Sequence, residues 1–301
     1  MPEPNTQKRI LDPLSPPDAD NFEHALSLLC ARYPLIEHNT LGRSMLGREL
    51  SLLGLGRGKP TVIYLGGRSG ADRLSTAVLT RFINEYCELH LRRGRIFGYN
   101  LNYLTELRRI ELLPMLNPDG IGYTLHGVDA EHILHRRLLA LNAGSEDFSA
   151  WTGNARGVAL DLNYATADFS TRKTEALTAA AECGMTAGWC GESPESEPES
   201  AAVGRLLRCR GDIGMVIELC CGPRRVICAK SADRKTVGLG RMLGRLCGIP
   251  LEFSDGSRFC DWAAEAFSLP AFTVYCGESS EMFELYAGVR EMLFVAPTLI
   301  G

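Results

Sequence analysis

Apolar residues along this chain follow two different spacings, which predict buried strands and amphipathic helices. The run Thr61–Leu65 (TVIYL) is short, rich in β-branched residues and uninterrupted, which is typical of a strand buried on both faces. The next segment has apolar side chains at helical spacing, at Val78, Leu79, Phe82, Ile83, Tyr86 and Leu89. We therefore expect a buried strand followed directly by a helix.

The same alternation continues to the end of the chain. We expect helices at about 20–32, 131–141, 196–209, 237–246 and 281–292, and further strands at 110–116, 213–219 and 271–276. Two short strands broken at Gly42 and Gly47 should follow the first helix, Asn117 to Gly120 should form a turn, and a long loop should reach about 170. Ser196 and Glu199 have capping-box spacing, which favours a helix start there. This order predicts one α/β domain, 21–301, with a mixed sheet, preceded by a polar segment, 1–20.

Composition and charge narrow the class of protein. The 301 residues are 45% hydrophobic and 23% charged, as in ordinary globular proteins. A net charge of -4 is too small to indicate a nucleic acid or a membrane surface as partner. Neither an apolar run of membrane-spanning length nor a secretory signal is visible, so we expect a cytoplasmic protein without a membrane span.

The chain contains eleven cysteines, an odd number without any C-x-x-C pair. A chain of this length does not need disulfides for stability, so we interpret the cysteines mainly as reduced, buried thiols. A metal or redox site built from thiols is the alternative.

Six segments, in order, resemble the zinc carboxypeptidase family, and most of all its bacterial branch that cleaves γ-D-glutamyl-L-diamino acid bonds in cell-wall peptides. They are LGRSMLGREL (41–50), PTVIYLGGRSGAD (60–72), LLPMLNPDG (112–120), LLALNAGSEDFSAWTGNARGVALDLN (138–163), SPESEPES (193–200) and DWAAEAFSLPAFTVYCG (261–277). The resemblance implies a zinc-carboxypeptidase-like single domain, with a mixed sheet of about eight strands flanked by helices on both faces. It also implies an active site at the carboxyl ends of the strands.

The zinc ligands that the resemblance implies are absent from this sequence. The family hydrolyses amides with a zinc-bound water, and the zinc is held by two His and one Glu. The corresponding positions here are Ser69, Asp72 and Leu219. No His follows His135, so a shift of the alignment restores no His on the later strand. Asp72 has a second interpretation, as the N-cap of the following helix.

The other catalytic positions differ as well. Tyr275 stands where the resemblance places the Glu that acts as base, and tyrosine is a poor base at neutral pH. In the family's substrate-carboxylate clamp, Asn163 is kept but Tyr164 replaces its Arg. Asn154 matches a family Asn. The resemblance therefore predicts a fold without its zinc and without its catalytic residues.

Three other sites remain open from the sequence. His132 and His135 are three residues apart on an expected helix and are a weak candidate for a metal pair. Cys220, Cys221 and Cys276 should lie near the former zinc site, where thiols favour a soft metal or redox chemistry. Ser69, in a strand–turn–helix, resembles a nucleophile, but a serine hydrolase of that type needs a later His.

We expect a catalytically inactive protein that binds a peptide, a cell-wall-peptide-like ligand or a protein partner in the former active-site cleft. The expected cleft residues are Arg68, Ser69, Asp72, Asn154, Asn163, Tyr164, Leu219, Arg258 and Tyr275. The alternatives are an active peptidase of the γ-D-glutamyl-diamino acid type with an altered metal site, and a purely structural role.

Overall fold

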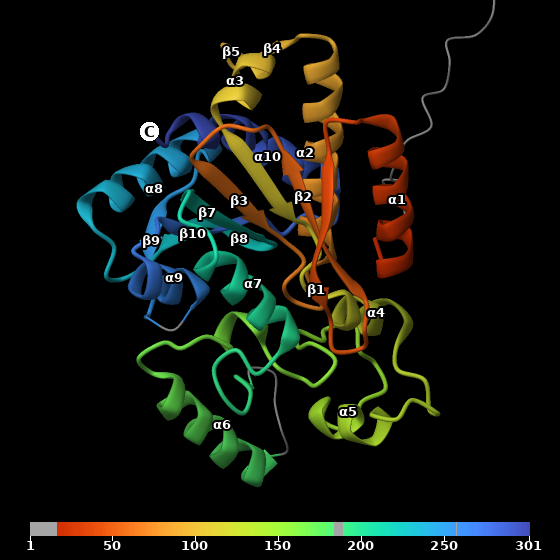
Figure 1. Ribbon diagram of the computed structural model, residues 1–301. Helices are drawn as coiled ribbons and strands as arrows, with labels where there is room; N and C mark the ends of the chain where they lie inside the picture. Colours follow the sequence, from red (N-terminus) through yellow and green to blue (C-terminus); the bar gives the residue numbers. More distant parts are fainter. Residues whose placement is uncertain (1–16, 184–188, 257) are drawn as a thin grey trace, which may run out of the picture.

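The computed structural model of the chain describes residues 17–183, 189–256 and 258–301, in which strands and helices alternate (Figure 1). The strands are β1 (Glu37–Arg43), β2 (Glu49–Leu55), β3 (Thr61–Leu65), β4 (Arg95–Ile96), β5 (Tyr99–Asn100), β6 (Arg109–Leu113), β7 (Ile213–Cys220), β8 (Gly222–Cys228), β9 (Leu251–Phe253) and β10 (Ala271–Gly277). The helices are α1 (Ala19–Arg32), α2 (Arg73–Leu91), α3 (Leu101–Leu107), α4 (Pro118–His126), α5 (His135–Leu141), α6 (Phe169–Cys183), α7 (Pro198–Arg208), α8 (Arg234–Cys247), α9 (Phe259–Phe267) and α10 (Met282–Val295). Short 3-10 turns occupy Leu160–Leu162 and Ala296–Thr298.

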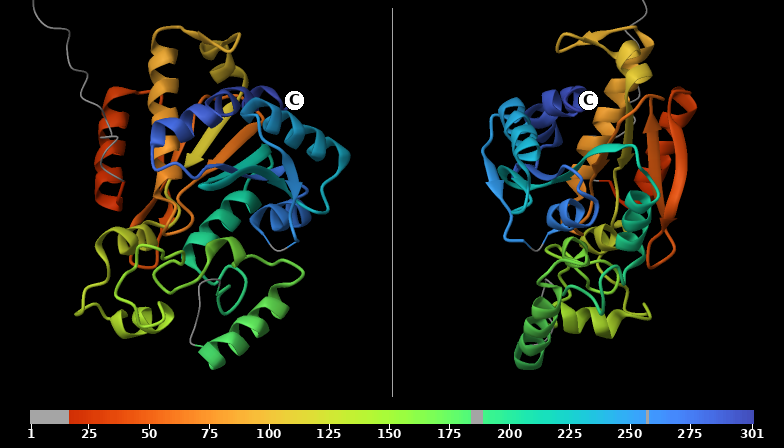
Figure 2. Two further views of the ribbon diagram at one scale, coloured as in Figure 1. Left: turned by 180° about the vertical axis from the view of Figure 1, so that it is seen from behind. Right: turned by 60° about the vertical axis from the view of Figure 1, so that its left-hand side comes forward.

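Eight of these strands form one mixed sheet in the order β1-β2-β6-β3-β7-β10-β8-β9. Its centre, β6-β3-β7-β10, is parallel, and antiparallel pairs flank it on both sides. The segment that carries α4, α5 and α6 lies beyond one end of this sheet (Figures 1 and 2). The predicted fold class, a mixed sheet of about eight strands with helices on both faces, is confirmed.

The two faces of the sheet have different cores because side chains alternate along each strand. Val62 and Tyr64 of β3 face a core shared with α1, α2, α8 and α10. Ile63 and Leu65 face the opposite core, which α7 and α9 complete. Burial on both faces explains why β3 is apolar at every position but its first.

Several predicted elements agree closely with the structure. β3 has the predicted bounds, α1 begins one residue before the predicted start, and β7 and β10 each extend one residue beyond the predicted end. Gly42 lies inside β1 at a bulge, so the first predicted strand does not break there. Asp18 caps α1, which begins at Ala19, within the predicted polar segment 1–20; residues 1–16 lie outside the described residues.

Four further local predictions differ from the structure. Asn117 to Gly120 is not a turn but the start of α4, because Asn117 caps the helix by accepting from the Gly120 amide and Pro118 fits the first helical position. The helix predicted at 131–141 begins only at His135. The long loop predicted up to 170 contains the 3-10 turn at 160–162 and the start of α6. Glu197, not Ser196, is the N-cap of α7.

Candidate functional site

A group of polar side chains gathers at the carboxyl ends of three parallel strands. Arg68 follows β3, Glu218 and Cys220 lie on β7, and Thr273 and Tyr275 lie on β10. The strand register brings them to one level, because Glu218 is opposite Leu65 at the end of β3 and Cys220 is opposite Tyr275. Alternation along β7 and β10 directs these side chains to one face of the sheet.

Arg68 is the centre of this group. One guanidinium nitrogen lies 2.9 Å from Glu218 Oε2 and 3.6 Å from Asp161 Oδ2. Thr273 donates a hydrogen bond of 3.0 Å to the same Glu218 oxygen. Glu218 is only 1% exposed, and its burial raises its pKa while Arg68 offsets part of that rise. The positive charge of the guanidinium therefore offsets part of the free-energy cost of burying the Glu218 carboxylate.

A cavity of about 290 Å³ opens beside Arg68. Its lining residues are Arg68, Ser69, Thr152, Ala159, Leu160, Asp161 and Leu162. Asp161 at its wall also lies 3.6 Å from the guanidinium of Arg258. The cavity is large enough for a small polar group or the end of a peptide side chain, and it has both a cation and an anion at its wall.

Tyr275 is held between two residues of β8. Arg225 lies directly opposite it in the antiparallel pair, with its guanidinium carbon 4.7 Å from the ring centroid. A Cβ at Gly222 would lie 2.8 Å from Cδ1 of the ring, and Gly222 has φ +144°. Burial raises the pKa of Tyr275 further above its ordinary value. Tyr275 is thus a neutral aromatic wall and not a base at neutral pH.

Asp72 is the N-cap of α2, as its second interpretation predicted. Its Oδ1 accepts from the Ser75 amide at 3.3 Å, whereas its Oδ2 is buried without a partner. Burial raises the pKa of Asp72 to about 6, although the nearby Cys221 thiol and Ser75 counteract part of this rise. The hydroxyl of Ser69, three residues earlier, is partly exposed, and no hydrogen bond joins it to a histidine in the described part of the chain.

Leu219 points away from this site. It is fully buried in the core that α2, α8 and α10 share, on the face opposite Glu218 and Cys220. Cys220 is therefore the residue of β7 that lies beside Tyr275 and Arg68.

The cysteines at the site lie close together. The Sγ atoms of Cys221 and Cys276 are 4.0 Å apart, and the Cys276 thiol donates to the carbonyl of Cys220. The contact with Cys276 and burial raise the pKa of Cys221 well above its ordinary value, which keeps the thiol protonated. Across the ten described cysteines, seven are buried and none forms a disulfide.

The donors at this site do not fit zinc. Zinc needs three protein ligands, but Leu219 has no donor atom and Asp72 is engaged as a helix cap. Within residues 17–183, 189–256 and 258–301, no three His, Cys, Asp or Glu side chains are grouped so as to hold a metal ion. His132 lies in the turn before α5, where its Nδ1 accepts from the Leu134 amide, so it does not share a helix face with His135.

Asn154 and Asn163 are fully buried and engaged in internal hydrogen bonds. The Asn154 amide donates to Glu197 and Glu199 at 2.8 and 3.2 Å. The amide of Asn163 donates to the carbonyls of Cys190 and Ser193, and its oxygen accepts from Ser200. These two residues hold the loops around α7 rather than line the cavity.

Tyr164 is buried in an aromatic cluster. Its ring stacks on Trp262 with centroids 4.4 Å apart and meets Phe259 at 5.3 Å.

The structure brings five residues of the site together: Arg68, Ser69, Asp161, Arg258 and Tyr275.

Sequence reasoning missed Asp161, Glu218 and Arg225. Glu218 had a visible signal, because it is a single charge in the apolar run MVIELCC and a buried charge needs a partner. Asp161 had a similar signal, because it is a single charge in the run VALDL, whereas Arg225 had none, since it follows another arginine, Arg224.

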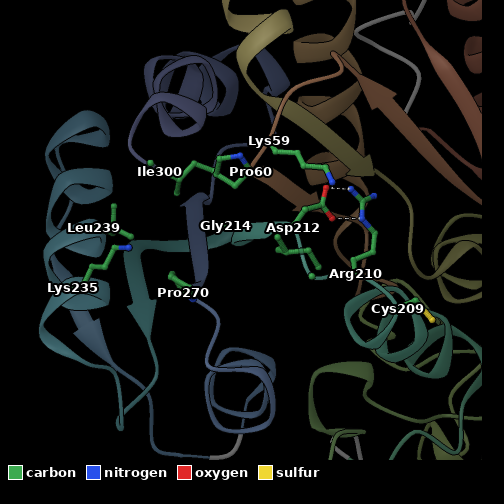
Figure 3. A pocket seen from close by; sticks show the side chains of 13 residues that line it. Lys59, Pro60, Cys209, Arg210, Asp212, Gly214, Lys235, Leu239, Pro270 and Ile300 are labelled. Atoms are coloured by element: carbon green, nitrogen blue, oxygen red, sulfur yellow. Dashed lines mark hydrogen bonds and ion pairs between the residues drawn. The ribbon is translucent and has the colours of Figure 1, made fainter.

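A larger cavity lies elsewhere (Figure 3). It has about 780 Å³ and opens at the amino ends of β3, β7 and β10, the edge of the sheet opposite Arg68. Arg210 and Asp212 at its wall pair with each other at 2.8 Å. Its position separates it from the site around Arg68.

Comparison with known proteins identifies the family that this sequence matches. The family model described as zinc carboxypeptidase matches residues 22–232. Gamma-D-glutamyl-L-diamino acid endopeptidase 1 of Lysinibacillus sphaericus is 28% identical over 198 residues, which are 63% of this chain and 48% of that protein. The uncharacterized protein YqgT of Bacillus subtilis is 29% identical over 193 residues, covering 63% of this chain and 50% of YqgT. The chain thus spans about half the length of the curated relatives it matches.

Several solved structures have the same fold. Bovine thrombin-activatable fibrinolysis inhibitor, in complex with tick carboxypeptidase inhibitor, superimposes with a TM-score of 0.71 at 16% identity, over 95% of this chain and 96% of that chain. Carboxypeptidase A of Helicoverpa armigera gives 0.68 at 15%, over 96% and 75%. Murein-tripeptide amidase MpaA of Escherichia coli O157 gives 0.53 at 19%, over 87% and 90%. At these identities the likeness shows the fold alone.

Proposed function

The chain belongs to the zinc carboxypeptidase family, and from this premise we propose that it is a catalytically inactive member that binds the acidic end of a peptide in its former active-site cleft. The described helices include none long and apolar enough to cross a membrane. The ligand class is suggested by the relative that is named for cleaving γ-D-glutamyl-L-diamino acid bonds.

The position of Leu219 is the main observation that supports the proposal of a catalytically inactive protein. Amide hydrolysis in this family needs a metal with three protein ligands and a base that accepts the proton of water. Leu219 is packed in the core, and Tyr275 at the base position is a neutral phenol beneath Arg225. Neither residue can perform the role that its position has in the family.

The remaining polar groups favour binding. Arg68 and Asp161 line the cavity, and Arg258 lies next to Asp161. Guanidinium groups held by packing bind carboxylates with two parallel hydrogen bonds, which suits the acidic end of a peptide.

A second candidate function is an active peptidase with an altered metal site. It is favoured by the contact of Cys221 with Asp72 and by the 4.0 Å between Cys221 and Cys276. Elemental analysis of protein purified without chelators and incubated with zinc separates the two functions. We expect far less than one zinc per chain, whereas one tightly held zinc that is lost in Asp72→Ala would establish the second function.

The experiment that tests binding is a melting-temperature titration with γ-D-glutamyl-diaminopimelate peptides. A ligand that binds only the folded state stabilises it by RT ln(1 + [L]/Kd), about 2.7 kcal/mol at a hundredfold excess over Kd. We expect a saturable rise in melting temperature with an acidic peptide and no cleavage of that peptide by mass spectrometry. Cleavage would refute the proposal that the protein is inactive. A melting temperature that does not change with acidic peptides would refute the binding role.

A further inference from the structure

Arg225 has a guanidinium without an acidic partner in the described part of the chain. Its Nε is buried and has no hydrogen-bond acceptor. The neighbouring arginines of the site differ from it, because Arg68 pairs with Glu218 and Asp161, and Arg258 pairs with Asp161. The charge of Arg225 is thus not neutralised by a carboxylate of the described residues, and a buried N–H donor is left without a partner, which costs free energy until an acceptor arrives.

The ring of Tyr275 holds this guanidinium in place. The two residues face each other across β8 and β10, and the guanidinium carbon lies 4.7 Å from the ring centroid. The ring also lies close against the backbone of Gly222, so it cannot turn toward that side unless the backbone moves. A cation on an aromatic face keeps its N–H donors at the edge free for an anion.

Tyr275 also connects Arg225 with the cleft. It lies opposite Cys220 of β7, and the charges of Arg68 and Arg258 act on its hydroxyl. Tyr275 therefore has the unpaired guanidinium of Arg225 over its ring, and the charge of the paired guanidinium of Arg68 acts on its hydroxyl.

We propose that Arg225, positioned by Tyr275, is the carboxylate-binding residue of this cleft. The inference rests on the proposed function, since it names the group that receives the acidic end of the peptide. A carboxylate matches the fork of a guanidinium with two parallel hydrogen bonds. It would also supply the acceptor and the negative charge that Arg225 lacks.

The first test compares two peptides on four proteins. The peptides are γ-D-glutamyl-diaminopimelate and the same peptide with its carboxylates converted to amides, and the proteins are wild type, Arg225→Gln, Arg225→Lys and Arg234→Gln. We expect Arg225→Gln to weaken the acid at least about tenfold by calorimetry and to leave the amide unchanged. Arg225→Lys keeps the charge without the fork, so an intermediate loss is expected.

Arg234→Gln is the matched control, because Arg234 is exposed in the first turn of α8 and has no hydrogen bond or ion pair within the described residues. Tyr275→Phe keeps the ring and should bind as wild type, whereas Tyr275→Leu removes the ring and should weaken the acid. Equal binding of the acid to wild type and Arg225→Gln would overturn the inference while the proposed function stood.

The second test needs no peptide. In a protein with ¹⁵N-labelled arginine, acetate is titrated at constant ionic strength while the Nε–Hε resonances are followed. We expect one resonance, absent in Arg225→Gln, to shift with saturation. If that resonance shifts and no peptide binds, the proposed function fails and the anion site remains; if acetate leaves it unmoved, the inference fails.

Discussion

The Arg68 guanidinium lies 2.9 Å from the Glu218 carboxylate, and both side chains are buried. Arg68 comes from the turn after β3 and Glu218 from β7, so the pair joins two central strands at their carboxyl ends. A buried ion pair of this kind is costly to break because the remaining charge has no water around it.

We expect Arg68→Ala to lower the free energy of unfolding by about 3–5 kcal/mol, since Glu218 would remain buried without its partner. The double variant Arg68→Met, Glu218→Leu removes both charges and should be clearly more stable than Arg68→Ala. Urea unfolding at pH 7 measures both. A double variant no more stable than the single one would show that the pair is not the source of the loss.

Asp72 should make the protein less stable as the pH rises. Burial raises its pKa in the folded state to about 6, from an ordinary 3.8, so the folded chain binds this proton more tightly than the unfolded chain. Its favourable contribution is complete below about pH 4 and is lost as the pH rises through about 6. Asp72→Asn keeps an N-cap oxygen for the Ser75 amide and should be more stable than wild type at pH 8, by on the order of 2 kcal/mol.

Unfolding free energies of wild type and Asp72→Asn between pH 4 and pH 8 check this prediction. The difference between the two proteins should grow over this range. Parallel curves would mean that Asp72 is solvated in the folded protein.

Asn154→Ala should impair stability and not ligand affinity alone. Its amide donates to Glu197 and Glu199, both of which are buried, and burial raises the pKa of Glu199 to about 7. Removal of the donor leaves two carboxylates with fewer partners, so we expect a loss of about 2–4 kcal/mol. Asn154→Ala with wild-type stability and weaker peptide binding would instead assign Asn154 to the ligand.

Gly222→Ala should displace Tyr275. The new Cβ would lie 2.8 Å from Cδ1 of the ring, and alanine is strained at φ +144°. We expect a lower melting temperature, with a loss of about 1–3 kcal/mol, together with weaker binding of acidic peptides. Gly238→Ala in α8 is the control, because a Cβ there meets no atom within 4 Å. Unchanged peptide binding in a folded Gly222→Ala protein would separate Tyr275 from the ligand.

Much of the fold was predictable from local sequence. β3 and α2 were visible because a buried strand is apolar throughout and a helix on a sheet is apolar every three to four residues. The helices α6 and α9 and the strands β8 and β9 were not predicted. β9 has only three residues, and most of β8 and β9 is polar or partly exposed, so neither has a clear periodicity.

The sequence by itself determined what this site cannot contain. The chain has no histidine after His135, and the side chain of a leucine has no atom that binds a metal in any fold. These statements follow from the chemistry of single side chains, so they needed no coordinates.

Only the tertiary structure decided which residues meet. Arg68, Asp161, Glu218 and Arg225 come from four separate segments, and strand register places Glu218 opposite the end of β3 and Arg225 opposite Tyr275. The same register turned Leu219 into the core and Cys220 toward Tyr275, because neighbouring residues of a strand face opposite sides of the sheet. Burial and partners depend on this packing, which is why the sequence alone did not distinguish Asn154, inside the protein, from Arg225, beside the cleft.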